Sequence, residues 1–220
     1  MKTRADADAI SERVRAAENV VVIGAGFIGL EFAGVAAALG ARVHVLELGD
    51  RPMARALSHI TSQRFREAHE GWGVTFDFEQ GLQRIEGEDG QVRRVITADG
   101  RAIDADLVVY GIGVIPNTAL AEAAGLTIEN GIRVDAQLQT EDPFISAVGD
   151  AVNFPCVQLD SAPTRLESVQ NAADQARCLA ARLTGTSAPY VATPWFWSDQ
   201  GDLKLQIVGM SNGYNNTVEL

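Results

Sequence analysis

Residues 19–31, with the sequence NVVVIGAGFIGLE, decide the fold of this chain. The continuous apolar run Asn19–Ile23 is typical of a strand that is buried on both faces. Gly24–Gly29 then turns the chain, and Phe27–Leu39 has the length and composition of a helix. A second β-branched strand is expected at Ala41–Leu46. Strand, glycine turn, helix and strand in this order predict a parallel βαβ unit.

Three glycines of the turn carry a possible binding function. Gly24, Gly26 and Gly29 match G-x-G-x-x-G, which indicates a dinucleotide-binding Rossmann unit when a strand precedes it and a helix follows. Gly24 permits the tight turn, Gly26 lacks a Cβ that would block a diphosphate, and Gly29 lets the helix pack close to the strand. We expect the phosphates at the helix N-terminus, beside Phe27 and Ile28. The alternative interpretation is a plain turn between a strand and a helix.

The acidic residues near this unit bear on which nucleotide it binds. Glu47 ends the second strand, where a carboxylate can accept hydrogen bonds from the adenosine ribose and repel a 2′-phosphate, so NAD is favoured over NADP. Arg51 and Arg55 argue in the other direction, because arginines suit a 2′-phosphate, and Arg55 is kept as a candidate binding residue. Glu31 has two interpretations: a solvent-facing carboxylate that compensates the helix dipole, or a residue at the nicotinamide end of the cofactor.

A small antiparallel meander is expected to be inserted in the sheet. Short alternating segments at Leu82–Ile85, Gln91–Thr97 and Ala102–Ile103 are separated by GEDG and ADG, which are hairpin signals. Buried parallel strands are expected before and after them, at Val74–Phe78 and Leu107–Tyr110. The other elements that we predict are helices at Asp8–Glu18, Ser58–Gly71 and Leu166–Leu183, strands at Ile145–Gly149 and Leu203–Val208, and a linker at Ala188–Ser198.

Composition and charge exclude several classes of function. The net charge is −11, from 18 Lys+Arg against 29 Asp+Glu, which disfavours a nucleic-acid partner. Cys156 and Cys178 form no CxxC pair, so neither a dithiol centre nor a metal site is expected. His44, His59 and His69 are scattered, and no catalytic triad is predicted. The charged N-terminus and the absence of a membrane-spanning pattern predict a cytoplasmic protein without a membrane partner.

Five motifs give the chain a family resemblance. VVVIGAGFIGLEFA, VVYGIGVIPNTALAEAAGL, TEDPFISAVGDA, RLESVQNAADQAR and PWFWSDQGDLKLQIVG occur in the order found in FAD-dependent ferredoxin reductases, which include the putidaredoxin and rubredoxin reductases. The resemblance implies an oxidoreductase that carries electrons from NADH through FAD to a ferredoxin-type iron–sulfur protein, for an oxygenase or P450 system. Its cofactors, FAD and NAD, would then carry the chemistry without a catalytic side chain.

The resemblance also assigns positions to the cofactors. Glu31 matches the acidic residue beside the nicotinamide, and Asp150 matches the aspartate that hydrogen-bonds the ribityl chain of FAD. A turn or helix cap is the alternative for Asp150, and core packing is the alternative for Trp195 and Trp197. Many relatives carry cysteine where this chain has Ala151. The other matched positions are Gly111, Ile112 and Gly113 in a second glycine turn over the dinucleotide, Gly149 beside Asp150, Glu167, Ser168 and Val169 at a helix N-terminus facing the flavin, and Trp197 near the flavin edge.

The expected fold class is therefore α/β, in three parts. Residues 1–125 form a Rossmann-like NAD-binding domain with the inserted meander, residues 126–187 form part of an FAD-binding domain, and residues 188–220 begin an α+β C-terminal domain. The family has a further G-x-G-x-x-G for FAD ahead of the NAD unit, whereas one helix precedes Val20 here. We therefore expect a fragment without the N-terminal FAD half. Three hypotheses follow: a reductase component, an NAD(H)-binding fragment that cannot retain FAD or turn over, and a piece that needs a companion chain for the missing segment.

Overall fold

The computed structural model describes residues 3–211 and 215–218, and these divide into two compact units. The first unit runs to Gly113 and is joined by Ser198–Lys204, and the second is built on Val114–Trp197. Each unit is described by itself below. The domain limits expected at residues 125 and 187 stay a prediction.

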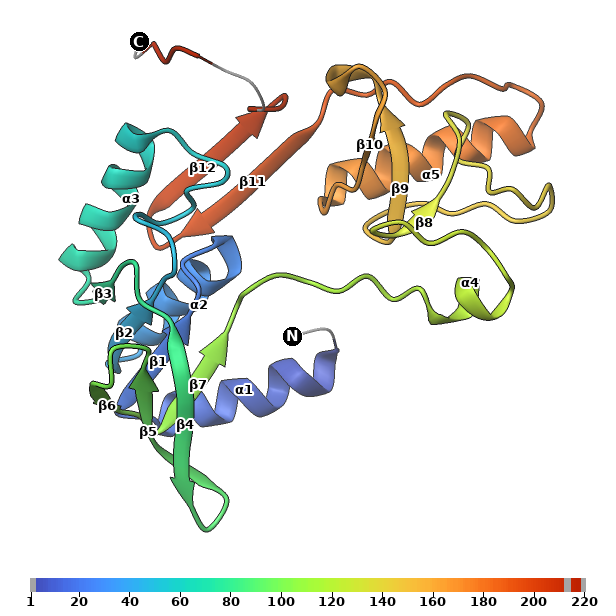
Figure 1. The fold of residues 1–220 in the computed structure, drawn as a ribbon. Coiled ribbons are helices and arrows are strands. Elements are labelled where there is room, and N and C mark those ends of the chain that lie inside the picture. The colour runs from blue at the N-terminus through green and yellow to red at the C-terminus, as the bar shows by residue number, and fades with distance from the viewer. Residues whose placement is uncertain (1–2, 212–214, 219–220) are drawn as a thin grey trace. The chain divides into compact units, whose positions relative to one another are not determined.

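A four-stranded parallel sheet is the centre of the first unit (Figure 1). Its strand order is β3-β2-β1-β7. Val20 of β1 pairs with Val43 of β2 on one side and with Leu107 of β7 on the other. The α/β fold with a parallel sheet is confirmed. The four strands are β1 (Asn19–Ile23), β2 (Arg42–Leu46), β3 (Thr75–Asp77) and β7 (Leu107–Tyr110).

Both faces of β1 are covered, as its uninterrupted apolar sequence predicts. On one face, helix α2 (Phe27–Ala38) approaches so closely that a Cβ on Gly29 would lie 3.4 Å from a methyl group of Val22. On the other face, Val21 belongs to a buried cluster with Val95 of the meander. Both valines are fully buried. The sheet is therefore held between α2 and the meander.

The meander forms an antiparallel sheet of its own, in the order β4-β5-β6, and none of its strands joins the parallel sheet. This corrects the expectation that it is inserted in that sheet, because its apolar side covers the face of the sheet through Val95. Asp89 and Gly90 form the β4–β5 turn with φ values of +52° and +75°, as an Asp-Gly hairpin turn requires. The strands are β4 (Leu82–Glu88), β5 (Gln91–Thr97) and β6 (Ala102–Asp104).

Side-chain caps fix the start of the other two helices in this unit. Helix α1 (Arg4–Ala16) begins before the expected Asp8, because Thr3 and Asp6 form a capping box in which each side chain accepts the other residue's N–H. Helix α3 (His59–Gly71) follows Ser58, whose hydroxyl accepts the N–H of Thr61 at 3.3 Å.

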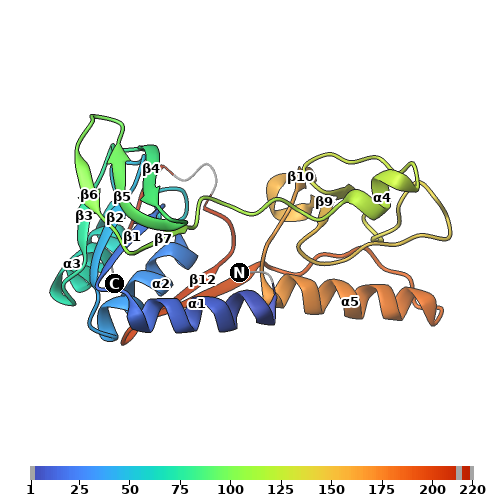
Figure 2. The same cartoon turned by 90° about the horizontal axis from the view of Figure 1, so that it is seen from below.

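The second unit contains a three-stranded sheet with a long helix beside it (Figures 1 and 2). The strand order is β10-β9-β8, with β9 antiparallel to β10 and parallel to β8. Phe154 of β9 packs on Tyr190, with ring centroids 5.3 Å apart, in the core of the unit. The elements are α4 (Ala119–Ala123), β8 (Ile132–Arg133), β9 (Val152–Cys156), a 3-10 turn (Val157–Leu159), β10 (Ala162–Thr164) and α5 (Val169–Leu183).

The prediction of a strand at Ile145–Gly149 is wrong. Only a single bridge, between Gln139 and Ser146, occurs there. The backbone of this segment is used in a turn instead: the N–H of Ile145 donates to the carbonyl of Asp142 at 3.1 Å. The strand lies after Asp150, as β9. This strand was not predicted because Pro155 lies within it, and a proline argues against a strand. In the structure, Pro155 pairs with Pro163 of β10.

A hairpin of β11 (Trp195–Gln200) and β12 (Leu203–Val208) ends the regular structure. Strand β12 lies where it was predicted, and β11 begins inside the stretch Ala188–Ser198 that was expected to be a linker. Across the residues that are described, no helix is long and apolar enough to cross a membrane.

Gly29→Ala is predicted to destabilise the chain, because a Cβ on Gly29 would lie 2.1 Å from the carbonyl oxygen of Gly24. We expect chemical denaturation to show a loss of about 1–3 kcal/mol in the free energy of unfolding, as for other overpacked sites. The matched control is Gly71→Ala, in another helix, where a Cβ meets nothing within 4 Å. Equal stability of the two variants would contradict the prediction.

Candidate functional site

Two glycine turns meet at the carboxyl edge of the parallel sheet. The Gly24–Gly29 turn follows β1 and the Gly111–Gly113 turn follows β7. The N–H of Gly111 donates to the carbonyl of Ile23 at 2.8 Å. Gly24 has a φ of +98°, and a Cβ on it would lie 2.7 Å from the Gly111 carbonyl oxygen. The two turns therefore pack backbone on backbone, and α2 starts at a fixed place beside both.

Gly26, the N-cap of α2, has few protein atoms beside it. Its φ of −79° is available to any residue. The atom nearest to a Cβ built on it is the Gly111 carbonyl oxygen, at 3.8 Å. The helix has no acidic residue in its first turn, and its N-cap residue has no side chain that could cap it. Room beside the positive end of a helix fits a diphosphate, which a side chain at this position would obstruct.

The Glu47 carboxylate closes the glycine turn from the side of β2. Its Oε2 accepts the N–H of Ala25 at 2.6 Å, and its Oε1 accepts the N–H of Gly49 at 2.7 Å. A carboxylate offers about four acceptor positions, so two backbone donors leave capacity for sugar hydroxyls. The sequence analysis considered only the ribose. The structure adds a second role for Glu47, which is to hold the turn in place.

The two arginines that follow β2 differ in their surroundings. In Arg51, Nη1 contacts Asp50 at 2.9 Å and Nη2 donates to the carbonyl of Ala54 at 3.1 Å. Its side chain is 20% exposed. Arg51 Nε is buried and has no hydrogen-bond partner among the described residues. Arg55 is exposed. The preference for NAD over NADP therefore rests on Glu47 and stays a prediction.

Glu31 is bound to a residue that is distant in the sequence. Its Oε1 accepts a hydrogen bond from the Ser198 hydroxyl at 2.6 Å. Ser198 is 1% exposed and belongs to β11. The sequence analysis did not select Ser198. The available signal was the alternation of β11, which buries the polar side chains of Ser198 and Gln200.

In the second unit, the positions matched to FAD lie around the start of α5. Gly149 has a φ of +85°, and its N–H donates to Gln175 at 2.7 Å. Asp150 is exposed, and its carbonyl accepts a hydrogen bond from Arg165 at 3.2 Å. Partial desolvation raises the pKa of the Asp150 carboxyl, repulsion from Glu167 raises it further, and Arg165 partly offsets this. Arg165 also pairs with Glu167, so it links the Gly149–Asp150 turn to the helix start.

The start of α5 and the two tryptophans complete this group of residues. The Ser168 hydroxyl caps α5 by accepting the N–H of Asn171 at 3.1 Å, and Val169 is the first helical residue. Trp195 and Trp197 have ring centroids 5.1 Å apart and are each 37% exposed. Both indoles therefore keep one surface accessible, which core packing alone does not explain.

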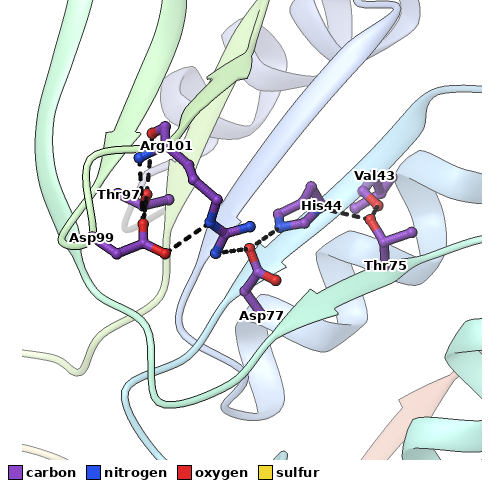
Figure 3. Close-up of polar contacts among 7 residues, drawn as sticks. All are labelled: Val43, His44, Thr75, Asp77, Thr97, Asp99 and Arg101. Carbon is purple, nitrogen blue, oxygen red and sulfur yellow. Dashed lines mark hydrogen bonds and ion pairs between the residues drawn. The ribbon is translucent and has the colours of Figure 1, made fainter.

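A second polar cluster lies between the parallel sheet and the meander (Figure 3). His44 Nδ1 is 2.8 Å from the Thr75 hydroxyl and Nε2 is 3.0 Å from the Asp77 carboxylate, which has the outline of a catalytic triad. However, the Thr75 hydroxyl donates to the carbonyl of Val43 at 3.1 Å. Its proton is therefore directed away from His44, which does not fit a nucleophile.

The remaining contacts of this cluster connect the two sheets. Arg101 reaches Asp77 and Asp99, each at 2.8 Å. Burial alone would raise the pKa of Asp77, but hydrogen bonds from Arg101 and His44 outweigh it and lower the pKa. The Thr97 hydroxyl, followed by Arg101, lowers the pKa of Asp99 to about 2. The cluster therefore connects β3 to the meander and stabilises their contact, and it does not have the arrangement of a reaction centre.

Comparison with known proteins identifies the family. Residues 1–176 match the family model described as pyridine nucleotide-disulphide oxidoreductase. The chain belongs to this family. Residues 195–219 match a second model, described as reductase C-terminal. Both matches agree with the resemblance stated from the motifs.

Similar proteins include several ferredoxin reductases. Rhodocoxin reductase of Rhodococcus erythropolis is 48% identical over 99% of this chain and 51% of its own length. Putidaredoxin reductase of Pseudomonas putida is 40% identical over 99% of this chain and 52% of its own length. A ferredoxin reductase structure from Rhodopseudomonas palustris matches with a TM-score of 0.94 and 49% identity, covering 97% of this chain and 53% of that one. The chain thus spans about half the length of the relatives that it matches.

Asp99→Asn is predicted to remove a stabilisation that depends on pH. The pKa of Asp99 is about 2 in the folded chain and about 3.9 in an unfolded chain, so its contribution is complete above about pH 4 and is lost as the pH falls toward 2. We expect urea denaturation at a series of pH values to show a difference between wild type and variant that shrinks across this range. Asp89→Asn, in the exposed hairpin turn, is the matched control, and an equal pH dependence there would contradict the attribution.

Proposed function

We propose that this chain is the NADH-binding part of a flavin-dependent reductase that passes electrons to a ferredoxin-type iron–sulfur protein. The observation that supports this most directly is the room beside Gly26, at a helix N-terminus whose first turn contains no acidic residue. The relatives named rhodocoxin reductase and putidaredoxin reductase match the chain across both units. A solved complex of putidaredoxin reductase with putidaredoxin, which matches with a TM-score of 0.91, supports an iron–sulfur protein partner.

NADH would bind across the carboxyl edge of the parallel sheet. Its diphosphate would lie at Gly26, against the first turn of α2, and its adenosine ribose would donate to Glu47. The Gly111–Gly113 turn, with Ile112 69% exposed, would cover the dinucleotide. Because the Glu47 carboxylate is held in place by two amides and would repel a 2′-phosphate, NADH is favoured over NADPH.

FAD would be held in part by the second unit. The exposed Asp150 offers a carboxyl group to the hydroxyls of the ribityl chain. The first turn of α5 contains no acidic residue, so its N-terminus, at Ser168 and Val169, can face the flavin ring and stabilise negative charge there. Trp197 would lie at the flavin edge. When bound, FAD supplies the chemistry that accepts a hydride and releases single electrons. The residues of the chain then orient NADH and exclude water.

A second candidate function is NAD(H) binding by this chain without turnover. Mixing the purified chain with FAD, gel filtration and addition of NADH separate the two. Yellow protein that NADH bleaches supports the reductase. Colourless protein whose tryptophan fluorescence is quenched by NADH supports the second candidate. Protein that binds neither ligand contradicts both, and the lack of a cooperative unfolding transition would indicate a need for a companion chain.

Gly26→Ala is predicted to weaken NADH binding without destabilising the fold. The added methyl group meets no protein atom closer than 3.8 Å but occupies the space assigned to the diphosphate. We expect calorimetry to show a Kd for NADH at least about tenfold higher, which corresponds to about 1.4 kcal/mol. Thermal unfolding is expected to be unchanged. Wild-type affinity in a folded variant would contradict the assignment of the diphosphate to this position.

A further inference from the structure

A chain of hydrogen bonds leads from the core of the first unit to the Glu31 carboxylate. His69 Nε2 lies 2.9 Å from Gln200 Oε1, Gln200 Nε2 donates to the Ser198 hydroxyl at 3.1 Å, and that hydroxyl donates to Glu31 Oε1 at 2.6 Å. Every donor in this series points toward the carboxylate. Such aligned bonds polarise one another and favour one arrangement of the side chains.

Three of the four residues in this series of hydrogen bonds are shielded from water. His69 is fully buried, and Ser198 and Gln200 are each 1% exposed. His69 Nδ1 is buried and has no hydrogen-bond partner among the described residues. Burial lowers the pKa of His69, although its hydrogen bond to Gln200 raises it in part. His69 is therefore neutral and uses Nε2–H as its donor. This determines the direction of the hydrogen bonds from His69 to Glu31.

Close packing against neighbouring rings also holds the segment that carries Ser198 and Gln200 in place. A Cβ on Gly201 would lie 2.6 Å from the Trp72 ring, so only glycine allows this close approach. Trp72 in turn packs edge-on against His69, with ring centroids 4.7 Å apart. On the α2 side, a Cβ on Gly34 would be 3.6 Å from both rings. The segment 198–201 is thereby docked against α2 and the end of α3, and the Ser198 hydroxyl has a fixed position.

Glu31, where this series of hydrogen bonds ends, is the one partly accessible residue of the four. Its Oε1 is engaged by Ser198, whereas Oε2 has no partner among the described residues. A glutamate side chain on a helix surface ordinarily samples several rotamers, and restricting them costs conformational entropy. The hydrogen bond from Ser198 already restricts the Glu31 side chain when no ligand is bound, so this entropy cost does not fall on ligand binding. One carboxylate oxygen is therefore presented in a defined position.

We propose that Ser198, held by Gln200 and His69, is a positioning residue that fixes Glu31 to accept a hydrogen bond from the carboxamide N–H of nicotinamide. This inference rests on the proposed NADH site and assigns β11 a part in it. The diphosphate and the adenosine half of NADH are held by other residues, around Gly26 and Glu47. Loss of Ser198 would consequently affect only the nicotinamide half of the ligand.

Calorimetric Kd values for NADH and for ADP-ribose, which lacks the nicotinamide, test the proposal. We expect Ser198→Ala to weaken NADH binding about three- to tenfold, as for the loss of one typical hydrogen bond, and to leave ADP-ribose binding unchanged. Ser198→Thr retains the hydroxyl and should restore NADH affinity. The matched control is Asp199→Asn: Asp199 is exposed in the same strand and pairs with Lys204 at 3.2 Å.

A second variant keeps the proposal testable if Ser198→Ala fails to fold. Glu31→Gln should weaken NADH and spare ADP-ribose in the same way, and the double variant should be no weaker than the weaker single variant. Equal effects on both ligands, no effect on either, or additive losses would overturn the proposal. If the wild type binds ADP-ribose but not NADH, the positioning role fails alone. If it binds neither ligand, the proposed function fails and the inference with it.

Discussion

The contact between the two glycine turns is the constraint on which the rest of the first unit depends. The carbonyl oxygen of Gly24 would lie 2.1 Å from a Cβ on Gly29, and that of Gly111 would lie 2.7 Å from a Cβ on Gly24. Both contacts exclude a side chain. They place the N-terminus of α2 at the carboxyl ends of β1 and β7. Any ligand that uses the amides of this helix end is therefore positioned by backbone rather than by side chains.

In the proposed binding mode, a chain with a net charge of −11 would hold an anionic ligand through backbone groups. The peptide dipoles of α2 favour negative charge at its N-terminus, and they do not titrate and need no arginine or lysine. Glu47 lies beside the turn and yet stabilises it, because the carboxylate accepts two backbone N–H groups. In the proposed mode the same negative charge would disfavour a further phosphate on the ribose. Binding of the diphosphate and discrimination at the sugar would then come from neighbouring groups.

The parts of the fold that follow local rules could be predicted from the sequence, and those that depend on distant partners could not. Strand β1 was predicted with its observed bounds, because the four apolar residues Val20–Ile23, between a helix and a glycine turn, permit little else. Strand β9 was missed because Pro155 argues against a strand until Pro163 is placed opposite it. The contact of Ser198 with Glu31 joins residues 167 positions apart, and no local pattern encodes it. The assignments of NAD and FAD residues remain predictions.

The central claim is that backbone amides at the start of α2 bind the diphosphate of NADH. Chemical-shift changes of the backbone amides during titration of the isotope-labelled chain with NADH test it most directly. The account predicts that the largest changes occur at Gly26, Phe27 and Ile28, with further changes in the Gly111–Gly113 turn. Saturable changes confined to other parts of the chain, or no changes in a folded sample, would contradict it.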